Sequence, residues 1–427
     1  MKYLYSDNAS NESSSMMFLF VYIYSALVLI RPHEYLPQLK DVPILPFILI
    51  MGAIIWIVYG RKSFHISQNK LIIIFLVILS LSPLFQGWPG GISIAFTKFY
   101  PIAIFYLILV SALDTSKRIT KFYWLMCVAA VIFAVHGIDQ TNNGVGWTGV
   151  SPVMDGRITY VGIFNDPNDL GNYFVATLPI IIYLFSASRS YLSRLTLSLS
   201  MGFVLYGIYL TNSRGAVLGV AGMLWVYLAS KYGFIKAILV SMLFSPLFLF
   251  GPSRITEIHP TEESAAGRVD AWYAGLEMLK NSGFLGVGYG GFVEHHHLTA
   301  HNSFVLVFSE LGVVGYFVWL SFLFLTLMMA YKMLSGSLSK EKEMRTDGDK
   351  LAYPIFYSLI GFCVTAFFLS RSYNIILYLL SALSVANYIN NTKHANILLT
   401  NYFWTIVFLT IGSILFFFII VKVLLNI

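Results

Sequence analysis

Four of the nine histidines lie within seven residues, in the segment 295–301. Imidazole groups act as metal ligands or as bases near neutral pH. His297 and His301 have the spacing that puts two imidazoles on one helical face for zinc, and His295 or Glu294 would supply a third ligand. Glycines before this cluster and the Thr299-Ala300 step within it argue against a continuous helix. We therefore interpret His295–His297 as solvated or site-lining residues and expect no metal, with a zinc site as the alternative.

His301 differs from its neighbours because it stands just before a predicted membrane helix. Asn302 and Ser303 come next, and then the strongly apolar run FVLVFSELGVVGYF, so His301 should lie at the start of a helix at the membrane boundary. Nearby arginines would lower the pKa of its imidazole, and a neutral imidazole can deprotonate a hydroxyl group. The alternative is a polar residue that only caps the helix.

An arginine at the start of a predicted helix is the second chemical signal. In the segment 211–219 (TNSRGAVLG), Thr211, Asn212 and Ser213 are good helix N-caps, which places Arg214 in the first turn. The helix dipole disfavours a cation there unless an anion is bound between the guanidinium and the free backbone N–H groups. Gly219 lies four residues after Gly215 and should let a neighbouring helix approach closely. A surface arginine reaching lipid headgroups is the alternative.

Arg268 lies near the start of a second predicted helix, 267–280, and we expect it in the first turn. The apolar stripe of this amphipathic helix is Val269, Trp272, Tyr273, Leu276 and Leu279. The following segment, 283–291, holds five glycines in nine residues. It either lets a substrate approach the backbone closely or simply bends the chain. We count Tyr289 within it as a lining residue.

Three further cations are candidates. Arg157 precedes the segment Asp166-Pro167-Asn168-Asp169, whose polar side chains should cap the next helix. Lys98 lies inside an apolar run, where a charge costs about 2.5–3.5 kcal/mol and is a functional hypothesis by default. Arg371 begins another apolar run. For Lys98 and Arg371, a side chain that extends to the membrane surface remains the alternative.

The composition of the chain predicts the kind of fold that positions these residues. The chain is 57% hydrophobic and 11% charged, whereas a soluble domain has about 25% charged residues. We predict an all-α polytopic membrane protein, a single integral membrane domain over residues 1–427. About twelve to thirteen transmembrane helices are expected, near 16–30, 43–59, 70–85, 93–113, 121–138, 170–187, 192–211, 215–231, 234–251, 311–331, 352–370, 373–390 and 403–425. The polar N-terminus does not resemble a cleaved signal peptide, and both cysteines fall in apolar runs.

The basic residues predict the orientation. One set of alternate loops holds 17 of the 27 lysines and arginines, and the opposite set holds eight. The positive-inside rule makes the first side cytoplasmic, which puts the loops 139–169 and 252–301 outside. The net charge of +7 is then a topology signal, and we expect no nucleic-acid partner. The outer arginines oppose this rule and need another explanation.

Several of these segments occur together in a known order. The blocks 211–219, Gly267-Arg268 with Trp272, GFLGVGYGGF (283–292) and His301-Asn302 followed by Glu310-Leu-Gly312 resemble the O-antigen ligase and O-antigen polymerase superfamily of bacterial envelope glycosyltransferases. The segment 156–174 is also similar to that superfamily. The resemblance covers roughly residues 90 to 390. His295–His297 lies outside the shared pattern, and no motif separates ligase from polymerase.

The resemblance implies a GT-C-type fold in the bacterial inner membrane, with its active site facing the periplasm. It implies a glycan donor on undecaprenyl pyrophosphate and transfer without a cofactor or metal. By matching motif, Arg214 and Arg268 would bind the pyrophosphate and His301 would act on the acceptor hydroxyl. Lys98 and Arg157 are further expected pyrophosphate contacts, and Asn302, His297, Tyr289 and Arg371 are expected acceptor or lining residues.

We expect an O-antigen ligase that joins a glycan to lipid A-core. The first alternative is an O-antigen, capsule or exopolysaccharide polymerase, whose acceptor is a second lipid-linked glycan. The second is a small-solute transporter, which should place ionisable groups at mid-membrane on broken helices. The outer position of most candidate ionisable residues favours an enzyme, with Glu310 and Lys98 as the exceptions.

Overall fold

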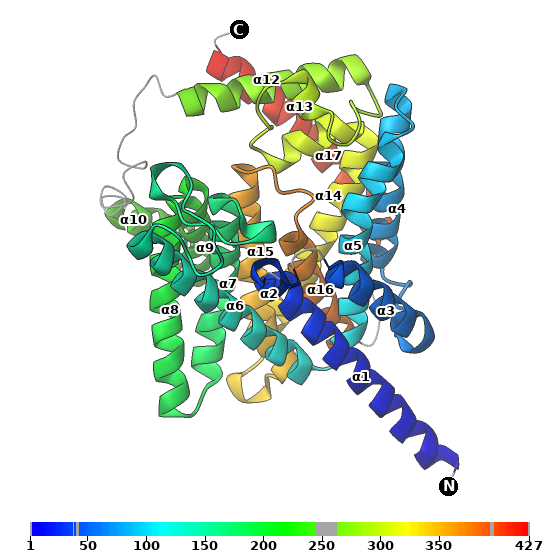
Figure 1. The fold of residues 1–427 in the computed structure, drawn as a ribbon, viewed down its shortest axis with the longest axis vertical. Helices are drawn as coiled ribbons and strands as arrows, with labels where there is room; N and C mark the ends of the chain where they lie inside the picture. Colours follow the sequence, from blue (N-terminus) through cyan, green and yellow to red (C-terminus); the bar gives the residue numbers. More distant parts are fainter. Residues whose placement is uncertain (1, 37, 40–41, 245–262, 393–396, 426–427) are drawn as a thin grey trace. The chain divides into compact units, whose positions relative to one another are not determined.

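The computed structural model describes all residues except 1, 37, 40–41, 245–262, 393–396 and 426–427 (Figure 1). The described part of the chain is built of α-helices and short 3-10 helices, with an isolated bridge between Val153 and Arg157 and no sheet. Two compact units are formed, each from three separate stretches of the chain. The predicted start of the large outer loop, 252–262, lies outside the described residues.

The first unit comprises residues 1–61, 108–258 and 333–365. Its helices are α1 (Lys2–Ile30), α2 (Pro32–Tyr35), α3 (Ile44–Tyr59), α6 (Ser116–Asn143), α7 (Pro167–Ala187), α8 (Tyr191–Thr211), α9 (Arg214–Tyr232), α10 (Phe234–Phe244) and most of α15 (Asp347–Phe367). The 3-10 helices η2 (Met154–Gly156), η3 (Gly162–Phe164) and η5 (Lys342–Met344) lie in its loops. Helix α7 is the centre of the unit, because it packs on α6, α8 and α9 and is buried along most of its length.

The second unit comprises residues 62–107, 259–332 and 366–427. Its helices are α4 (Ser67–Leu81), η1 (Ser82–Gln86), most of α5 (Gly91–Ala112), α12 (Glu263–Ser282), α13 (Phe292–His295), most of α14 (Ser303–Leu338), α16 (Ile375–Asn391) and α17 (Leu399–Leu425). Aromatic side chains fill its interior. Phe99 and Phe322 pack against Tyr378, and Phe367 stacks on Phe417.

Each predicted span coincides with a helix, and the prediction of an all-α polytopic membrane protein is confirmed. Eight described helices are long and apolar enough to cross a membrane: α4 with η1, α5, α6, α7, α9, α14, α15 and α17. Three apolar helices are shorter, namely 14–30 of α1, α3 and α16. Helices α8 and α10 fall outside both sets, and the predicted end of the α10 span at 251 is not among the described residues. The sidedness of the loops stays a prediction.

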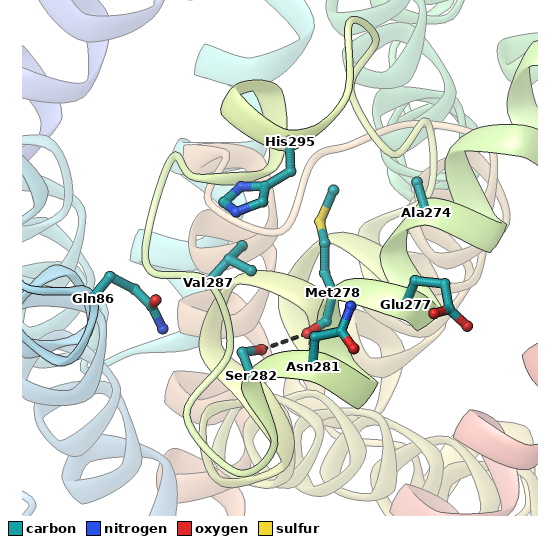
Figure 2. A pocket seen from close by; sticks show the side chains of 8 residues that line it. All are labelled: Gln86, Ala274, Glu277, Met278, Asn281, Ser282, Val287 and His295. Carbon is teal, nitrogen blue, oxygen red and sulfur yellow. Dashed lines mark hydrogen bonds between the residues drawn. The ribbon is translucent and has the colours of Figure 1, made fainter.

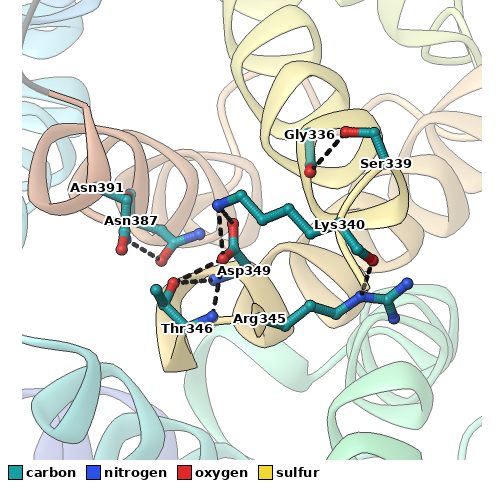
Figure 3. A network of polar contacts seen from close by, with 8 residues as sticks. All are labelled: Gly336, Ser339, Lys340, Arg345, Thr346, Asp349, Asn387 and Asn391. Atoms are coloured by element: carbon teal, nitrogen blue, oxygen red, sulfur yellow. Dashed lines mark hydrogen bonds and ion pairs between the residues drawn. The ribbon is translucent and has the colours of Figure 1, made fainter. Parts of the chain in front are cut away.

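Polar contacts stabilise the predicted cytoplasmic connection that leads into α15 in the first unit (Figure 3). Lys340 Nζ lies 2.8 Å from Asp349 Oδ2, and the Thr346 backbone N–H donates to the same oxygen at 2.9 Å. Arg345 Nε donates to the Lys340 carbonyl at 3.3 Å. An acidic residue in the first helical turn also suits the helix dipole. These basic residues therefore have local structural partners.

Helix α12 confirms the predicted amphipathic helix but corrects two of its details. It already runs from Glu263, so Arg268 lies in the second turn and not in the first; Glu263, Ala265 and Ala266 are good helix formers that extend it. The buried positions are Ala271, Trp272, Gly275 and Met278, whereas Tyr273 of the predicted stripe is 41% exposed. Packing on α17 and α14 selects this face, and Trp272 contacts the ring of Phe417.

Candidate functional site

In the first unit, Arg157 is held at the start of two helices. Its Nε donates to the carbonyl of Thr211 at 2.9 Å, and its Nη2 donates to Asn168 Oδ1 at 3.0 Å. Ser213 Oγ donates to the same Asn168 oxygen at 2.8 Å. Asn168 is in the first turn of α7, and Ser213 immediately precedes α9. One amide oxygen therefore links the Arg157 loop to the N-termini of both helices; we call Arg157, Asn168 and Ser213 the arginine cradle.

Arg214 is the first residue of α9, as predicted, and Ser213 caps this helix by accepting from the Ala216 backbone N–H at 3.3 Å. The chain reverses at Asn212, whose left-handed backbone (φ 46°) ends α8. Ser213 of the arginine cradle directly precedes Arg214 in the sequence, so the cradle and Arg214 meet at the start of α9. Two helix N-termini and two guanidinium groups meet here, beside the carboxylates of Asp166 and Asp169 at the start of α7.

Close helix packing fixes the position of α9. A side chain at Gly219 would put a Cβ atom 2.5 Å from Thr365 Cγ2 and 3.1 Å from Val175 Cγ1. The first distance is shorter than real Cβ contacts and the second is tight, so a side chain here would force α9 away from α15. The predicted close approach at Gly219 is therefore present.

Asp166 confirms the predicted helix cap of α7. Its side chain accepts from the Asn168 backbone N–H at 2.7 Å, and Pro167 occupies the first helical position. Asn168 does not cap the helix with its side chain; that amide belongs to the arginine cradle.

In the second unit, His301 lies two residues before α14, at the start of a helix as expected. Its backbone is left-handed (φ 47°), a conformation that is uncommon outside glycine. The N-cap is Asn302, whose Oδ1 accepts from the backbone N–H groups of Phe304 and Val305 at 2.9 and 3.0 Å. Capping is thus carried out by Asn302, and His301 is half-buried beside it.

The start of α14 is also tied to the chain that connects α15 to α16. Asn302 Nδ2 donates to the Phe367 carbonyl at 2.8 Å, and Ser303 Oγ donates to the Leu369 carbonyl at 2.6 Å. The Arg371 backbone N–H donates to Ser303 Oγ at 2.8 Å. The structure therefore brings together His301, Asn302 and Arg371 of the predicted site.

A tryptophan connects α12 to the histidine segment. Trp272 Nε1 donates to the Ala300 carbonyl at 3.1 Å, one residue before His301. His296 Nε2 lies 3.0 Å from Asp270 Oδ2 on the same helix. Arg268 is half-buried one turn before Trp272. Sequence reasoning placed Trp272 on an apolar stripe and missed this hydrogen bond, which no local pattern encodes.

The predicted glycine turn at 283–291 packs into a break in α14. Gly312 has φ 64° and ψ −169°, a region open almost only to glycine. The backbone N–H groups of Val287 and Gly288 donate to the carbonyls of Ser309 and Glu310 at 2.9 and 2.8 Å. The glycine turn thus supplies partners for carbonyl groups that the break removes from the helical ladder.

Glu310 is 3% exposed and lies beside this break. Its Oε1 accepts from the backbone N–H groups of Gly290 and Phe292 at 3.1 and 3.4 Å, and its Oε2 accepts from the Tyr373 hydroxyl at 2.9 Å. Burial, with the Glu310 carboxylate nearby, raises the pKa of Tyr289 to about 12. This phenol therefore stays protonated at physiological pH. The sequence places Glu310 in a family motif, but its anchoring role was not predicted.

The remaining candidates are more isolated. Lys98 is exposed in the second turn of α5, which is consistent with either a pyrophosphate contact or a lysine that reaches the membrane surface. His297 is exposed, and its ring lies 4.5 Å from that of His296. Residues 297–301 are not helical, so the helical zinc spacing is absent. Within the described ranges, no three or more His, Cys, Asp or Glu residues are grouped to hold a metal ion.

Comparison with protein families relates part of this set of residues to a known family. Residues 199–320 match the model of the O-antigen ligase family. This region is therefore similar to the O-antigen ligase family. It contains Arg214 in the first unit and Arg268, Tyr289, His297, His301 and Asn302 in the second. The resemblance to the O-antigen ligase and polymerase superfamily is therefore confirmed, and Arg157, Lys98 and Arg371 lie outside the matched region. No match was found among curated proteins.

Proposed function

We propose that the protein is an O-antigen ligase-type glycosyltransferase of the bacterial inner membrane, acting at the periplasmic face. It would transfer a glycan from undecaprenyl pyrophosphate to a hydroxyl group of lipid A-core. The observation that carries this proposal is the family match over 199–320, which includes Arg214, Arg268 and His301. The cationic helix starts around Arg157 and Arg214 support an anionic donor.

The arginines would act on the leaving group. Outside the inner membrane there is no ATP, so the transfer must use a donor that is already activated. Charge grows on the pyrophosphate as its bond to the sugar breaks, and guanidinium groups held in place can stabilise that charge. We assign this role to Arg214 and Arg268, with Arg157 and Lys98 as further contacts. Loss of one such contact typically costs about 2.7–4 kcal/mol in the transition state.

His301 would act on the acceptor. Its imidazole takes the proton from the acceptor hydroxyl, and the oxygen attacks the anomeric carbon as the bond from that carbon to the phosphate oxygen breaks. The electron pair of that bond leaves with the pyrophosphate, and in-line attack inverts the anomeric configuration. The backbone contacts of Asn302 and Ser303 support this assignment, because they fix the segment that bears the imidazole.

Reconstitution tests the proposal. Purified full-length protein is supplied with undecaprenyl-pyrophosphate glycan and either lipid A-core or a second lipid-linked glycan. Glycan attached to lipid A-core supports the ligase, and elongated lipid-linked chains mean a polymerase of the same chemistry. Intact, folded protein that makes neither product would overturn the enzyme assignment. Activity should also persist in EDTA; a loss that zinc restores would revive the metal alternative.

One observation favours a second candidate, a small-solute transporter. A buried glutamate beside a broken apolar helix, as at Glu310 and Gly312 in α14, is typical of transporter binding sites. However, the Glu310 carboxylate already accepts three hydrogen bonds, and the glycine turn fills the break. These contacts explain the break and the buried glutamate without a bound solute, and we therefore favour the enzyme. Solute uptake by proteoliposomes without glycan transfer would reverse that preference.

A further inference from the structure

A cavity of mixed polar and apolar lining in the second unit belongs to none of the roles assigned above. It has a volume of about 360 Å³ and lies between α12, the glycine turn and the end of η1 (Figure 2). The residues that line it are Gln86, Ala274, Glu277, Met278, Asn281, Ser282, Val287 and His295. On the predicted topology, both η1 and α12 are at the outer face.

The lining combines several kinds of hydrogen-bonding group with a small apolar surface. Gln86 Nε2 donates to the Gly286 carbonyl at 2.6 Å, which fixes the amide at the cavity. His295 Nδ1 lies 2.8 Å from the Gly291 carbonyl; because a carbonyl only accepts, the proton is on Nδ1 and, in the neutral ring, Nε2 is an acceptor. Met278 and Val287 supply buried apolar surface.

A second cavity of about 120 Å³ adjoins the first, because both are lined by Gln86 and Val287. It adds two aromatic residues, Trp88 and Tyr289, and the carboxylate of Glu294. The Trp88 side chain is 45% exposed, and Tyr289 packs edge-on against Tyr373 at 5.1 Å. We call the two cavities together the α12 groove.

We propose that the α12 groove is a binding subsite for uncharged sugar residues of a glycan. Sugars present both hydroxyl groups and apolar C–H faces, which fit amide, carboxylate and imidazole groups beside the exposed ring of Trp88 and the half-buried ring of Tyr289. The lining contains two carboxylates, Glu294 and Glu277, of which Glu277 pairs with Lys280 at 3.3 Å, and itself holds neither lysine nor arginine, so it disfavours a phosphate. This inference rests on the proposed function, since it concerns the same substrates.

The groove lies away from Arg268, the cation assigned to the pyrophosphate on the same helix. Along α12, Ala274 is about 9 Å and Asn281 about 20 Å from Arg268, at about 1.5 Å per residue. The sugars in the groove are therefore not the pair that react. They belong either to the distal part of the donor glycan or to the acceptor glycan, and binding there should depend on glycan length.

Two variants test the groove. Ala274→Phe fills the larger cavity without removing a polar group, and Asn281→Leu removes one amide at an exposed position near the end of α12. Tyr273→Phe is the matched control, because Tyr273 is on the same helix, is 41% exposed and lines neither cavity. Unfolding temperatures identify any variant that fails to fold.

Kinetics with the full-length protein separate the sources of the glycan. We compare lipid-linked donors that carry one or several repeat units, and lipid A-core as acceptor. Losing one or two sugar hydrogen bonds should raise KM about tenfold with kcat nearly unchanged. A rise confined to the longer donor assigns the groove to the donor glycan, and a rise for lipid A-core assigns it to the acceptor. Folded variants with unchanged KM for all substrates would overturn the inference.

A binding measurement keeps the inference independent of turnover. The glycan is released from its lipid, and its contact with wild-type protein and with Ala274→Phe is followed by saturation-transfer NMR. A signal lost in Ala274→Phe but kept in Tyr273→Phe supports the groove even if no transfer occurs, in which case only the proposed function fails. Equal signals for all three proteins would contradict the groove alone.

Discussion

His301 combines an unusual backbone conformation with the chemical role that we assign to it, and substitutions can separate the two. The left-handed backbone (φ 47°) costs about 1–2 kcal/mol for a residue with a Cβ atom, so histidine and alanine share this cost and glycine does not. His301→Ala should therefore lose turnover while keeping nearly the wild-type unfolding temperature, and His301→Gly should lose turnover while keeping or slightly raising it. Glycan transfer and thermal unfolding measure these effects.

The control for this pair is His296→Gln. Glutamine can still donate a hydrogen bond to Asp270, which His296 contacts at 3.0 Å, so this variant should retain most of its turnover. If His301→Gly transfers glycan at the wild-type rate, His301 is not the base. Loss of activity in His296→Gln but not in His301→Gly would move the chemistry to the His295–His297 segment.

Asn168 offers a test of whether the arginine cradle binds an anion or only holds the fold. In the wild-type protein, Arg157 and Ser213 donate to Asn168 Oδ1 at 3.0 and 2.8 Å. Asn168→Asp keeps this acceptor oxygen but adds a negative charge. The carboxylate would compete with pyrophosphate for Arg157, so the donor KM should rise about tenfold while stability is maintained. Steady-state kinetics with varied donor provide the measurement.

Asn168→Ala is the comparison, because it removes both hydrogen bonds and should lower the unfolding temperature. If the arginine cradle only holds the fold, Asn168→Asp would leave the donor KM unchanged. The acceptor KM should stay constant in both variants, since the cradle is assigned to the donor.

At the residue scale, the sequence predicted which residues cap helices better than it predicted which residues contact each other. Ser213 and Asp166 act as helix caps, as expected from their side chains and positions. The hydrogen bond from Trp272 to Ala300 and the three bonds accepted by Glu310 were missed. Those partners come from segments that are distant in sequence, so no local pattern could specify them.

At the scale of elements, the break in α14 should depend on Gly312. A side chain there would place Cβ 2.1 Å from the Phe284 carbonyl oxygen, and its backbone angles are almost closed to other residues. Gly312→Ala should therefore destabilise the protein by about 1–3 kcal/mol, detach the glycine turn from α14 and reduce turnover. Thermal unfolding and limited proteolysis of the 283–291 segment measure these changes.

Helix α14 also provides a matched control. Gly336 is in the same helix, and a side chain there would meet no atom within 4 Å. Gly336→Ala should be neutral or stabilise slightly, because alanine favours helix over glycine. If the two substitutions have equal effects on stability, the break at Gly312 is not required by the fold.

The helices themselves could be predicted because a membrane span needs about 20 apolar residues, a requirement that each sequence segment meets or fails locally. The 311–331 run was recognised, but α14 extends to Ser303–Leu338 and contains the break. Arg268 was placed one turn too early because the helix formers before it extend α12 to Glu263. The buried face of α12 could not be predicted from the apolar stripe, because packing against distant segments selects it.

At the scale of the whole molecule, orientation in the membrane decides whether the proposed chemistry is available. The positive-inside rule puts residue 142 outside and residue 343 inside. Both side chains are exposed, and the two native cysteines are buried or half-buried in helices. Asn142→Cys should therefore react with a membrane-impermeant maleimide in intact spheroplasts, and Glu343→Cys only after permeabilisation. Labelling of the parent protein gives the background. The reverse pattern would put the Arg157 loop on the cytoplasmic side, away from a periplasmic glycan donor, and would overturn the proposed function.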